Sequence, residues 1–73
     1  MKIEFSNHAI TRLLERHIDP WKTKEVVKSP SWRQLQTDGS MAVRKEIEGV
    51  LIEVIYIEKG RTKVIKTAYF PTK

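Results

Sequence analysis

One short segment near the start of the sequence gathers polar residues of types that can carry chemistry. His8, Arg12, Glu15 and Arg16 follow one another at spacings of four, three and one. At about 3.6 residues per turn, this spacing places the four side chains on one flank of a helix. Cutting an RNA phosphodiester without a metal needs a group that accepts the 2′-hydroxyl proton, a group that protonates the leaving oxygen, and cations that hold the phosphate. A histidine with two arginines can fill the first and third of these roles.

The same residues also fit an ordinary solvated helix face. A core stripe for this helix is predicted by apolar residues that recur at helical intervals, namely Ile10, Leu13, Leu14 and either His17 or Ile18. The basic residues fall roughly opposite that stripe, where charged side chains normally meet water. Glu15 then simply pairs with Arg12, an interaction worth about half a kcal/mol or less. Spacing alone leaves both interpretations open.

The first 30 residues predict a short strand and two helices. Residues 2–5 alternate polar and apolar side chains, which is typical of a strand. Ser6 suits the N-cap of a helix over residues 7–17, because its hydroxyl can accept a backbone N–H of the first turn. The pair Asp19-Pro20 starts a second helix, which is expected over residues 20–28 with core contacts from Trp21, Val26 and Val27.

Ser29-Pro30 ends that helix, because the residue before a proline is pushed out of the helical region. The hydrophobic period then changes from 3.6 to 2, which predicts strands. The expected elements are a weak strand over 32–36, a turn over 37–40, a strand over 41–47, a hairpin turn at Glu48-Gly49, a strand over 50–58, a turn over 59–61 and a last strand over 62–70. The sequence thus predicts one α+β domain over residues 1–73 in the order βααββββ, with two N-terminal helices packed on one face of an antiparallel sheet.

Charge indicates the kind of partner. The chain has 14 lysines and arginines against nine acidic residues, a net charge of +5. A small domain with this excess is predisposed to bind anions, nucleic acid first among them, although the same charge is ordinary for a stable small protein. There are no cysteines, which excludes disulfides, thiolate zinc sites and cysteine nucleophiles. Neither a membrane span nor a signal peptide is recognisable, so a cytoplasmic location is expected.

A metal site and a cofactor are not expected. His8 and His17 are too far apart on the first helix to share a ligand, and no carboxylate joins them. Trp21 and Trp32 are interpreted as core residues or a partner surface, rather than as base-stacking platforms.

The last strand adds candidates for binding. Ile65, Thr67 and Tyr69 are expected on one face, because side chains alternate along a strand. Tyr69 could bond a phosphate or stack on a base, although a strand tyrosine is more often a half-buried residue with a wet tip. A basic sheet face for phosphates is the other hypothesis, against a merely solvated outer face, and its members would be Arg44, Lys63 and Lys66.

Residues 6–18, Ser-Asn-His-Ala-Ile-Thr-Arg-Leu-Leu-Glu-Arg-His-Ile, resemble the opening of a small prokaryotic family of unknown function. Its signature is S/T-x-H-A-x-x-R-[LM]-x-E-R-x-I. The similarity continues through residues 19–27 and Ser29-Pro30, and residues 64–69 are similar to the family's V-[IV]-T-[AV]-Y ending. The family is grouped with the RelE/ParE-like toxin superfamily, whose best-known members are ribosome-linked ribonucleases, and which also contains gyrase-directed and inactive members.

The chain departs from that family at two positions. His17 stands where the family usually has a small residue such as glycine, which suits the left-handed close of a helix. Lys66 is inserted before Thr67, which leaves open the face that Thr67 and Tyr69 present.

The resemblance implies a RelE-like fold and a toxin-type, metal-independent RNA endonuclease or a close relative of one. In that hypothesis His8 transfers a proton, Arg12 and Arg16 hold the phosphate, and Tyr69 positions the substrate. The implied partners are RNA, ribosome-associated in the best-known members, and an antitoxin protein. The alternatives are a basic module that binds nucleic acid or an antitoxin without cutting, and a small regulatory subunit whose polar helix face binds an acidic protein.

Overall fold

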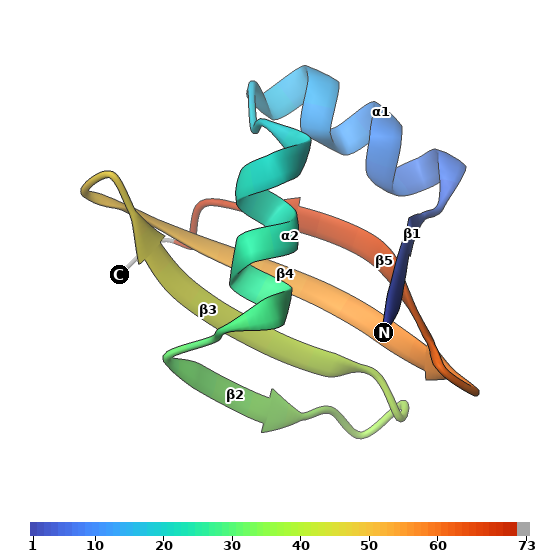
Figure 1. Ribbon diagram of the computed structural model, residues 1–73. Coiled ribbons are helices and arrows are strands. Elements are labelled where there is room, and N and C mark those ends of the chain that lie inside the picture. Colours follow the sequence, from blue (N-terminus) through green and yellow to red (C-terminus); the bar gives the residue numbers. More distant parts are fainter. Residues whose placement is uncertain (72–73) are drawn as a thin grey trace.

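Five strands form one sheet, and two helices pack against it (Figure 1). The structure is a computed structural model that describes residues 1–71. The strands stand in the order β1-β5-β4-β3-β2. Along the chain the elements are β1 (Lys2–Phe5), α1 (Asn7–Arg16), α2 (Pro20–Lys28), β2 (Trp32–Leu35), β3 (Met41–Ile47), β4 (Val50–Lys59) and β5 (Thr62–Tyr69). The predicted α+β class is confirmed, with two helices against a mostly antiparallel sheet.

The prediction of an antiparallel sheet is wrong at one edge. Neighbouring strands from β2 to β5 are antiparallel, but β1 pairs with β5 in parallel, from Lys2 opposite Thr62 to Phe5 opposite Ile65. The two helices carry the chain from β1 to the opposite edge of the sheet, and three hairpins bring it back beside β1. Side-chain alternation predicts a strand but not its partner, so this pairing was not foreseeable from the period.

The helix boundaries follow the capping signals. Ser6 accepts a hydrogen bond from the N–H of Ala9 at 3.0 Å, which confirms it as the N-cap of α1. The helix ends at Arg16, one residue earlier than predicted, because His17 takes a left-handed conformation with φ of 55°. His17 thus adopts the conformation for which the resembling family uses a small residue. The second helix covers the predicted residues 20–28.

The buried face of α1 is not the predicted stripe. Leu13 is buried as expected, but Ile10 is 46% and Leu14 73% exposed, while Ala9 is completely buried. The small Ala9 side chain lets the helix approach the sheet closely, and the face that meets the sheet therefore runs through Ala9, Leu13 and Arg16. In α2, Val26 and Val27 are buried as predicted, whereas the expected core residue Trp21 is 52% exposed.

The core occupies the space between the helices and one face of the sheet. Ala9 and Leu13 of α1 and Val26 and Val27 of α2 join a single cluster. From the sheet the cluster takes alternate residues of β4 and their cross-strand neighbours, namely Val43, Ile47, Ile52, Val54, Tyr56, Ile65 and Ala68. The helices therefore cover one face of the sheet, and the opposite face, termed here the open face, carries no helix.

A bulge in β5 decides which residues reach the open face. Ile65 pairs with Tyr56 and Thr67 pairs with Ile55, so the residue between them, Lys66, has no partner on β4. An extra residue of this kind exchanges the faces of the strand beyond it. Ile65 consequently lies in the core while Thr67 lies on the open face, and the expectation that both share one face is wrong.

The expected turns are present. Glu48 and Gly49 connect Ile47 to its partner Val50, and both have positive φ, 55° and 83°, as a type I′ hairpin turn requires.

Among residues 1–71, no helix is long and apolar enough to cross a membrane.

Replacing His17 with glycine should stabilise the protein. A left-handed backbone costs a residue with a Cβ atom about 1–2 kcal/mol, and this cost disappears with glycine. The greater freedom of glycine in the unfolded chain offsets about 0.5–1 kcal/mol of that gain. We expect a net gain of roughly 0.5–1 kcal/mol and a melting temperature higher by a few degrees. Leu14→Gly is the control, because this exposed helix position should lose about 0.8 kcal/mol. A lower melting temperature for His17→Gly would show that the imidazole contributes more than the backbone conformation costs.

Candidate functional site

Four side chains form an unbroken row across the open face. In register, Trp32 of β2 pairs with Arg44 of β3, Arg44 with Glu53 of β4, and Glu53 with Tyr69 of β5. Directly paired residues of antiparallel strands project from the same face of the sheet. The four residues Trp32, Arg44, Glu53 and Tyr69 are termed here the cross-sheet row.

Glu53 lies at the centre of the cross-sheet row and is the most buried charge in it. Its side chain is 7% exposed. Its Oε1 accepts a hydrogen bond from Nε of Arg44 and its Oε2 accepts one from the hydroxyl of Tyr69, both at 2.5 Å. A carboxylate is buried at tolerable cost only when its oxygens are bonded in this way, so Glu53 holds both neighbours in fixed positions.

Tyr69 is a phenol that resists ionisation. Burial raises its pKa above the ordinary value, and the hydrogen bond and charge of Glu53 raise it further. The positive charges of Arg44 and Arg16 oppose this shift but are smaller effects. At neutral pH, Tyr69 is therefore a neutral hydroxyl that donates to Glu53 between two guanidinium groups.

Arg16 joins the site from the helix side. Beyond Ile65, β5 has no partner in β1, and Arg16 Nη1 donates to the exposed edge instead, at 2.8 Å to the Ala68 carbonyl and 3.3 Å to the Thr67 hydroxyl. Its guanidinium carbon lies 6.0 Å from the centre of the Tyr69 ring. The packing of Ala9 and Leu13 turns this face of α1 toward β5, and so brings Arg16 to Tyr69.

The other predicted residues of α1 form a separate group. Arg12 Nε donates to His8 Nε2 at 3.3 Å, and Arg12 Nη1 donates to Glu15 at 2.9 Å. His8 and Glu15 are exposed, and Arg12 is partly so. His8 and Arg16 are two turns apart along α1, or about 12 Å at 1.5 Å per residue. The structure thus brings together Arg16, Tyr69 and Arg44, and leaves His8 with Arg12 at the other end of the helix.

The predicted basic sheet face is not formed. Lys63 pairs with Glu58, whose side chain is on the helix-covered face, and Lys63 Nζ donates to the Tyr56 hydroxyl at 3.2 Å. Lys66 sits in the bulge and forms an ion pair with Asp38 at 3.7 Å. Arg44 alone of the three predicted cations belongs to the cross-sheet row. The prediction did not consider which residues of each strand face the same side of the sheet, and it did not foresee the bulge. Both features separate Lys63 and Lys66 from Arg44.

Glu53 and Trp32 were not predicted as site residues, although the sequence around Glu53 indicates a special role for it. Glu53 is the only charged residue between Val50 and Ile57, the most apolar run of the sequence. A lone carboxylate in such a strand is rarely buried unless it is paired. Trp32 gave no comparable signal, because its role depends on which face of an edge strand it occupies.

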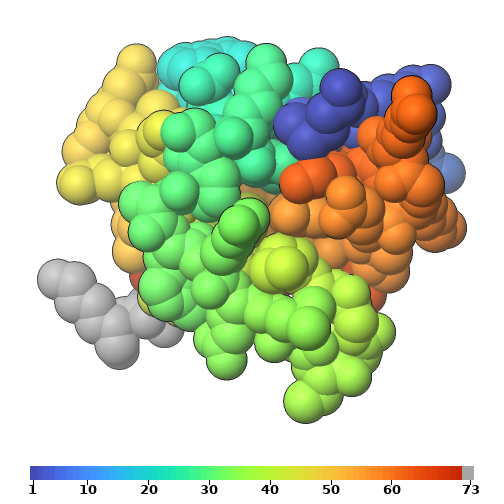
Figure 2. All heavy atoms as spheres, turned by 60° about the horizontal axis from the view of Figure 1, so that its bottom comes forward, coloured from blue at the N-terminus to red at the C-terminus, as the bar shows by residue number. Residues whose placement is uncertain are grey.

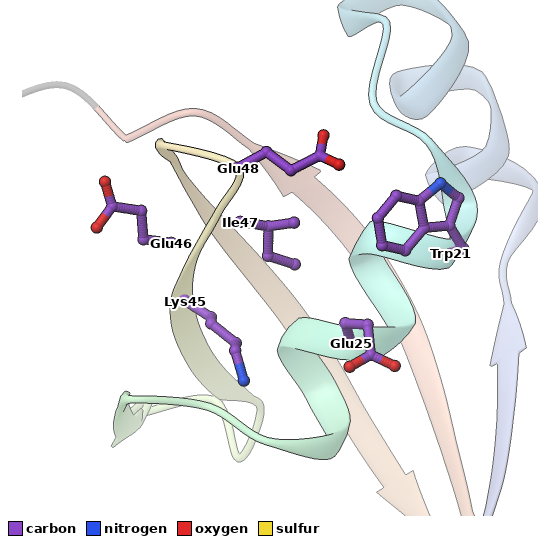
Figure 3. A pocket seen from close by; sticks show the side chains of 6 residues that line it. All are labelled: Trp21, Glu25, Lys45, Glu46, Ile47 and Glu48. Atoms are coloured by element: carbon purple, nitrogen blue, oxygen red, sulfur yellow. The ribbon is translucent and has the colours of Figure 1, made fainter.

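A groove between α2 and β3 contains none of the predicted site residues. It encloses about 370 Å³ and is lined by Trp21, Glu25, Lys45, Glu46, Ile47 and Glu48 (Figure 3). In Figure 3, Glu46 points away from α2, and Lys45 points toward the end of the helix, where it donates to the Ser29 carbonyl at 2.9 Å. Within residues 1–71, no three histidine or acidic side chains lie close enough to hold a metal ion.

Comparison with known proteins yields no relative: no family model, no curated protein and no solved structure matches the chain. The fold and site define an α+β domain whose helices cover one face of a sheet, while the open face carries an aromatic, cationic and acidic row. The RelE-like identity stays a prediction that rests on the sequence resemblance.

The titration of Tyr69 should reveal its coupling to Glu53. Because its folded-state pKa is raised above about 10, the value in the unfolded chain, Tyr69 contributes stability that is complete below pH 10 and is lost as the pH rises through the folded pKa. As the pH is increased, phenolate absorbance should therefore show one tyrosine that ionises above the ordinary pH range. This ionisation step should be missing from Tyr69→Phe. Unfolding measured above pH 10 should show a steeper loss of stability in the wild type than in Tyr69→Phe.

Glu53→Gln separates the charge of Glu53 from burial as a cause of this shift. The amide can still accept a hydrogen bond from Tyr69 but has no negative charge, so the Tyr69 titration should move to lower pH. Glu46→Gln, an exposed change on the same face of the sheet, should leave it in place. An unmoved titration in Glu53→Gln would mean that burial and the hydrogen bond, and not the charge of Glu53, raise the pKa of Tyr69.

Proposed function

We propose that this chain is a toxin-type RNA endonuclease, or a close relative of one, that cuts without a metal. The scissile phosphate would lie on the open face between Arg16 and Arg44, beside Tyr69. One observation carries the proposal: two guanidinium groups flank a half-buried phenol that already donates to a buried carboxylate. Cations next to a proton-transferring pair are what phosphodiester transfer requires.

The geometry supports the following division of labour. The 2′-hydroxyl of the substrate gives its proton to the oxygen of Tyr69 while Tyr69 passes its own proton to Oε2 of Glu53. The 2′-oxygen then attacks the phosphorus, and Arg16 and Arg44 stabilise the negative charge that accumulates on the phosphoryl oxygens. The bond to the 5′-oxygen breaks and that oxygen takes a proton from water, and Glu53 then returns its proton through Tyr69 to the hydroxide that remains. The products are a 2′,3′-cyclic phosphate and a 5′-hydroxyl.

His8 and Arg12 have a different place in this proposal from the one the sequence suggested. They lie about two turns and one turn along α1 from Arg16, the helix residue beside Tyr69, so both are outside the group formed by Arg16, Tyr69 and Arg44. We propose that the exposed Arg12 and His8 bind the RNA backbone next to the reacting centre. The rival hypothesis is that His8 transfers the proton. The cleavage assay described next distinguishes the two hypotheses.

RNA cleavage in the presence of EDTA should depend on Tyr69. Tyr69→Phe removes the proton-transferring oxygen and should slow cleavage by roughly 10²- to 10⁴-fold. Arg44→Gln should slow it by a comparable factor through lost charge stabilisation. At saturating RNA, His8→Ala should cut nearly as fast as the wild type, because the exposed His8 is proposed to bind the RNA backbone and lies outside the reacting centre. Product ends and thermal unfolding are measured for each variant, so that an unfolded protein is not taken for an inactive one.

Two results would redirect the assignment. Loss of cleavage in a folded His8→Ala protein, with Tyr69→Phe fully active, would move the reacting centre to the start of α1. RNA binding that weakens steeply with salt, without any cleavage by the wild type, would identify the alternative, a non-catalytic nucleic-acid-binding module.

A second candidate function, binding of an antitoxin protein, is favoured by an apolar groove beside α1. The groove encloses about 280 Å³ and all its lining residues are apolar: Phe5, Ile10, Leu13, Leu14, Ile18 and Pro20. Lys24 lies 5.8 Å from the Phe5 ring, and the chain carries +5 overall. An amphipathic helix with apolar side chains for the groove and acidic ones for its surroundings has matching chemistry.

Leu14→Glu should abolish binding of such a helix. Leu14 is 73% exposed, so a charge there leaves the core intact but repels an acidic, apolar partner. The measurement is co-purification with the product of the adjoining gene, co-expressed with each variant. Leu35→Glu is the matched control, because Leu35 is 67% exposed on β2, away from this groove. Equal co-purification with both variants, or none with the wild type, would contradict an antitoxin-binding role for the groove.

A further inference from the structure

Trp32 occupies the outer end of the cross-sheet row. It lies on β2, an edge strand whose residues are all exposed, and its own side chain keeps 38% of its surface accessible. In Figure 2, β2 and the turn after it form the lower border of the molecule. Its register partner Arg44 places its guanidinium carbon 4.4 Å from the centre of the indole ring. Trp32 is therefore not a core residue, contrary to one of the two interpretations of the sequence.

The position of Arg44 is fixed from both sides. Its Nε donates to the buried Glu53, and its planar end lies against Trp32. A guanidinium held in this way, next to a half-exposed indole, offers flat surfaces of the kind on which nucleobases stack. The cross-sheet row covers three inter-strand spacings, about 14 Å, from Trp32 to Tyr69. A base at one end and a phosphate at the other can thus belong to one short stretch of RNA.

We propose that Trp32 and Arg44 form a stacking subsite for an unpaired nucleobase, a role that the sequence did not predict for Trp32, and that the substrate is consequently single-stranded RNA. The inference rests on the proposed function and specifies its substrate class. Bases inside a duplex are stacked on one another and offer no free face to Trp32, whereas bases of a single strand can turn outward onto an aromatic ring. The stack discriminates little between bases, because every base has a flat face.

Trp21 provides a matched comparison within the same chain. It is also half exposed, but it lies on α2 at the rim of the groove that contains Glu25 and Glu48 (Figure 3). Lys22 lies 5.7 Å from the ring and forms an ion pair with Glu48 at 3.1 Å. Acidic side chains around Trp21 repel a phosphate backbone, so this second tryptophan should not respond to RNA.

The experiment measures the binding of a short 2′-O-methyl oligouridylate and of a 2′-O-methyl RNA duplex of equal length, at low salt with EDTA. Neither probe has a 2′-hydroxyl, so neither can be cut during the measurement. Trp32→Leu should weaken binding of the single strand by roughly 5- to 150-fold, the range for loss of one base–aromatic stack. Trp32→Phe should retain most of the affinity, because it keeps a ring, and Trp21→Leu should bind like the wild type. With Trp21→Phe, the remaining indole of Trp32 should be quenched by the single strand but not by the duplex.

Each possible result decides the proposal. Wild-type affinity in a folded Trp32→Leu protein, or duplex binding as tight as that of the single strand, would overturn the stacking subsite while the proposed endonuclease stands. Failure of the wild type to bind either RNA would remove the proposed function as well, and is recognised before any variant is made. Loss of affinity confined to Trp32→Leu, with rescue by phenylalanine, would establish the subsite.

Discussion

The buried carboxylate of Glu53 is the constraint on which the open face depends. An ionised group in the middle of the most apolar strand is tolerated only while both of its oxygens are bonded, and the two donors are the register partners on the neighbouring strands. Arg44 and Tyr69 are consequently held in place. Trp32 then lies against Arg44, so one buried charge organises side chains from four strands.

The helix side of the molecule has its own organising contact, between α1 and β5. Ala9 allows close packing, and Arg16 uses the same helix face to satisfy the free Ala68 carbonyl of β5. The rotation of the helix that achieves this leaves Ile10 and Leu14 outside the core. The packing of one helix therefore supplies a cation to the open face and an apolar groove to the opposite side of the molecule.

The sequence predicted local features well, because their physics is local. Ser6 caps α1 through a bond three residues away, and Glu48-Gly49 closes a hairpin through its own backbone angles. The parallel pairing of β1 with β5 depends on residues some 60 positions apart, and no period records it. The buried face of α1 was predicted wrongly because Ile10 and Leu14 are more hydrophobic than Ala9. Close packing of the helix against the sheet instead favours the smaller side chain of Ala9. Of the candidate site, Arg16, Arg44 and Tyr69 were named in advance, but their grouping required the register.

At the Lys66 bulge, the number of residues in β5 matters more than the type of the residue. Without this one residue, everything from Thr67 onward would exchange faces, so the Tyr69 ring would turn into the core and Ala68 toward solvent. Many amino acids can occupy position 66, because its backbone rather than its side chain sets the parity of the strand. A substitution at position 66 therefore keeps the faces of the strand, whereas its deletion would dismantle the open face.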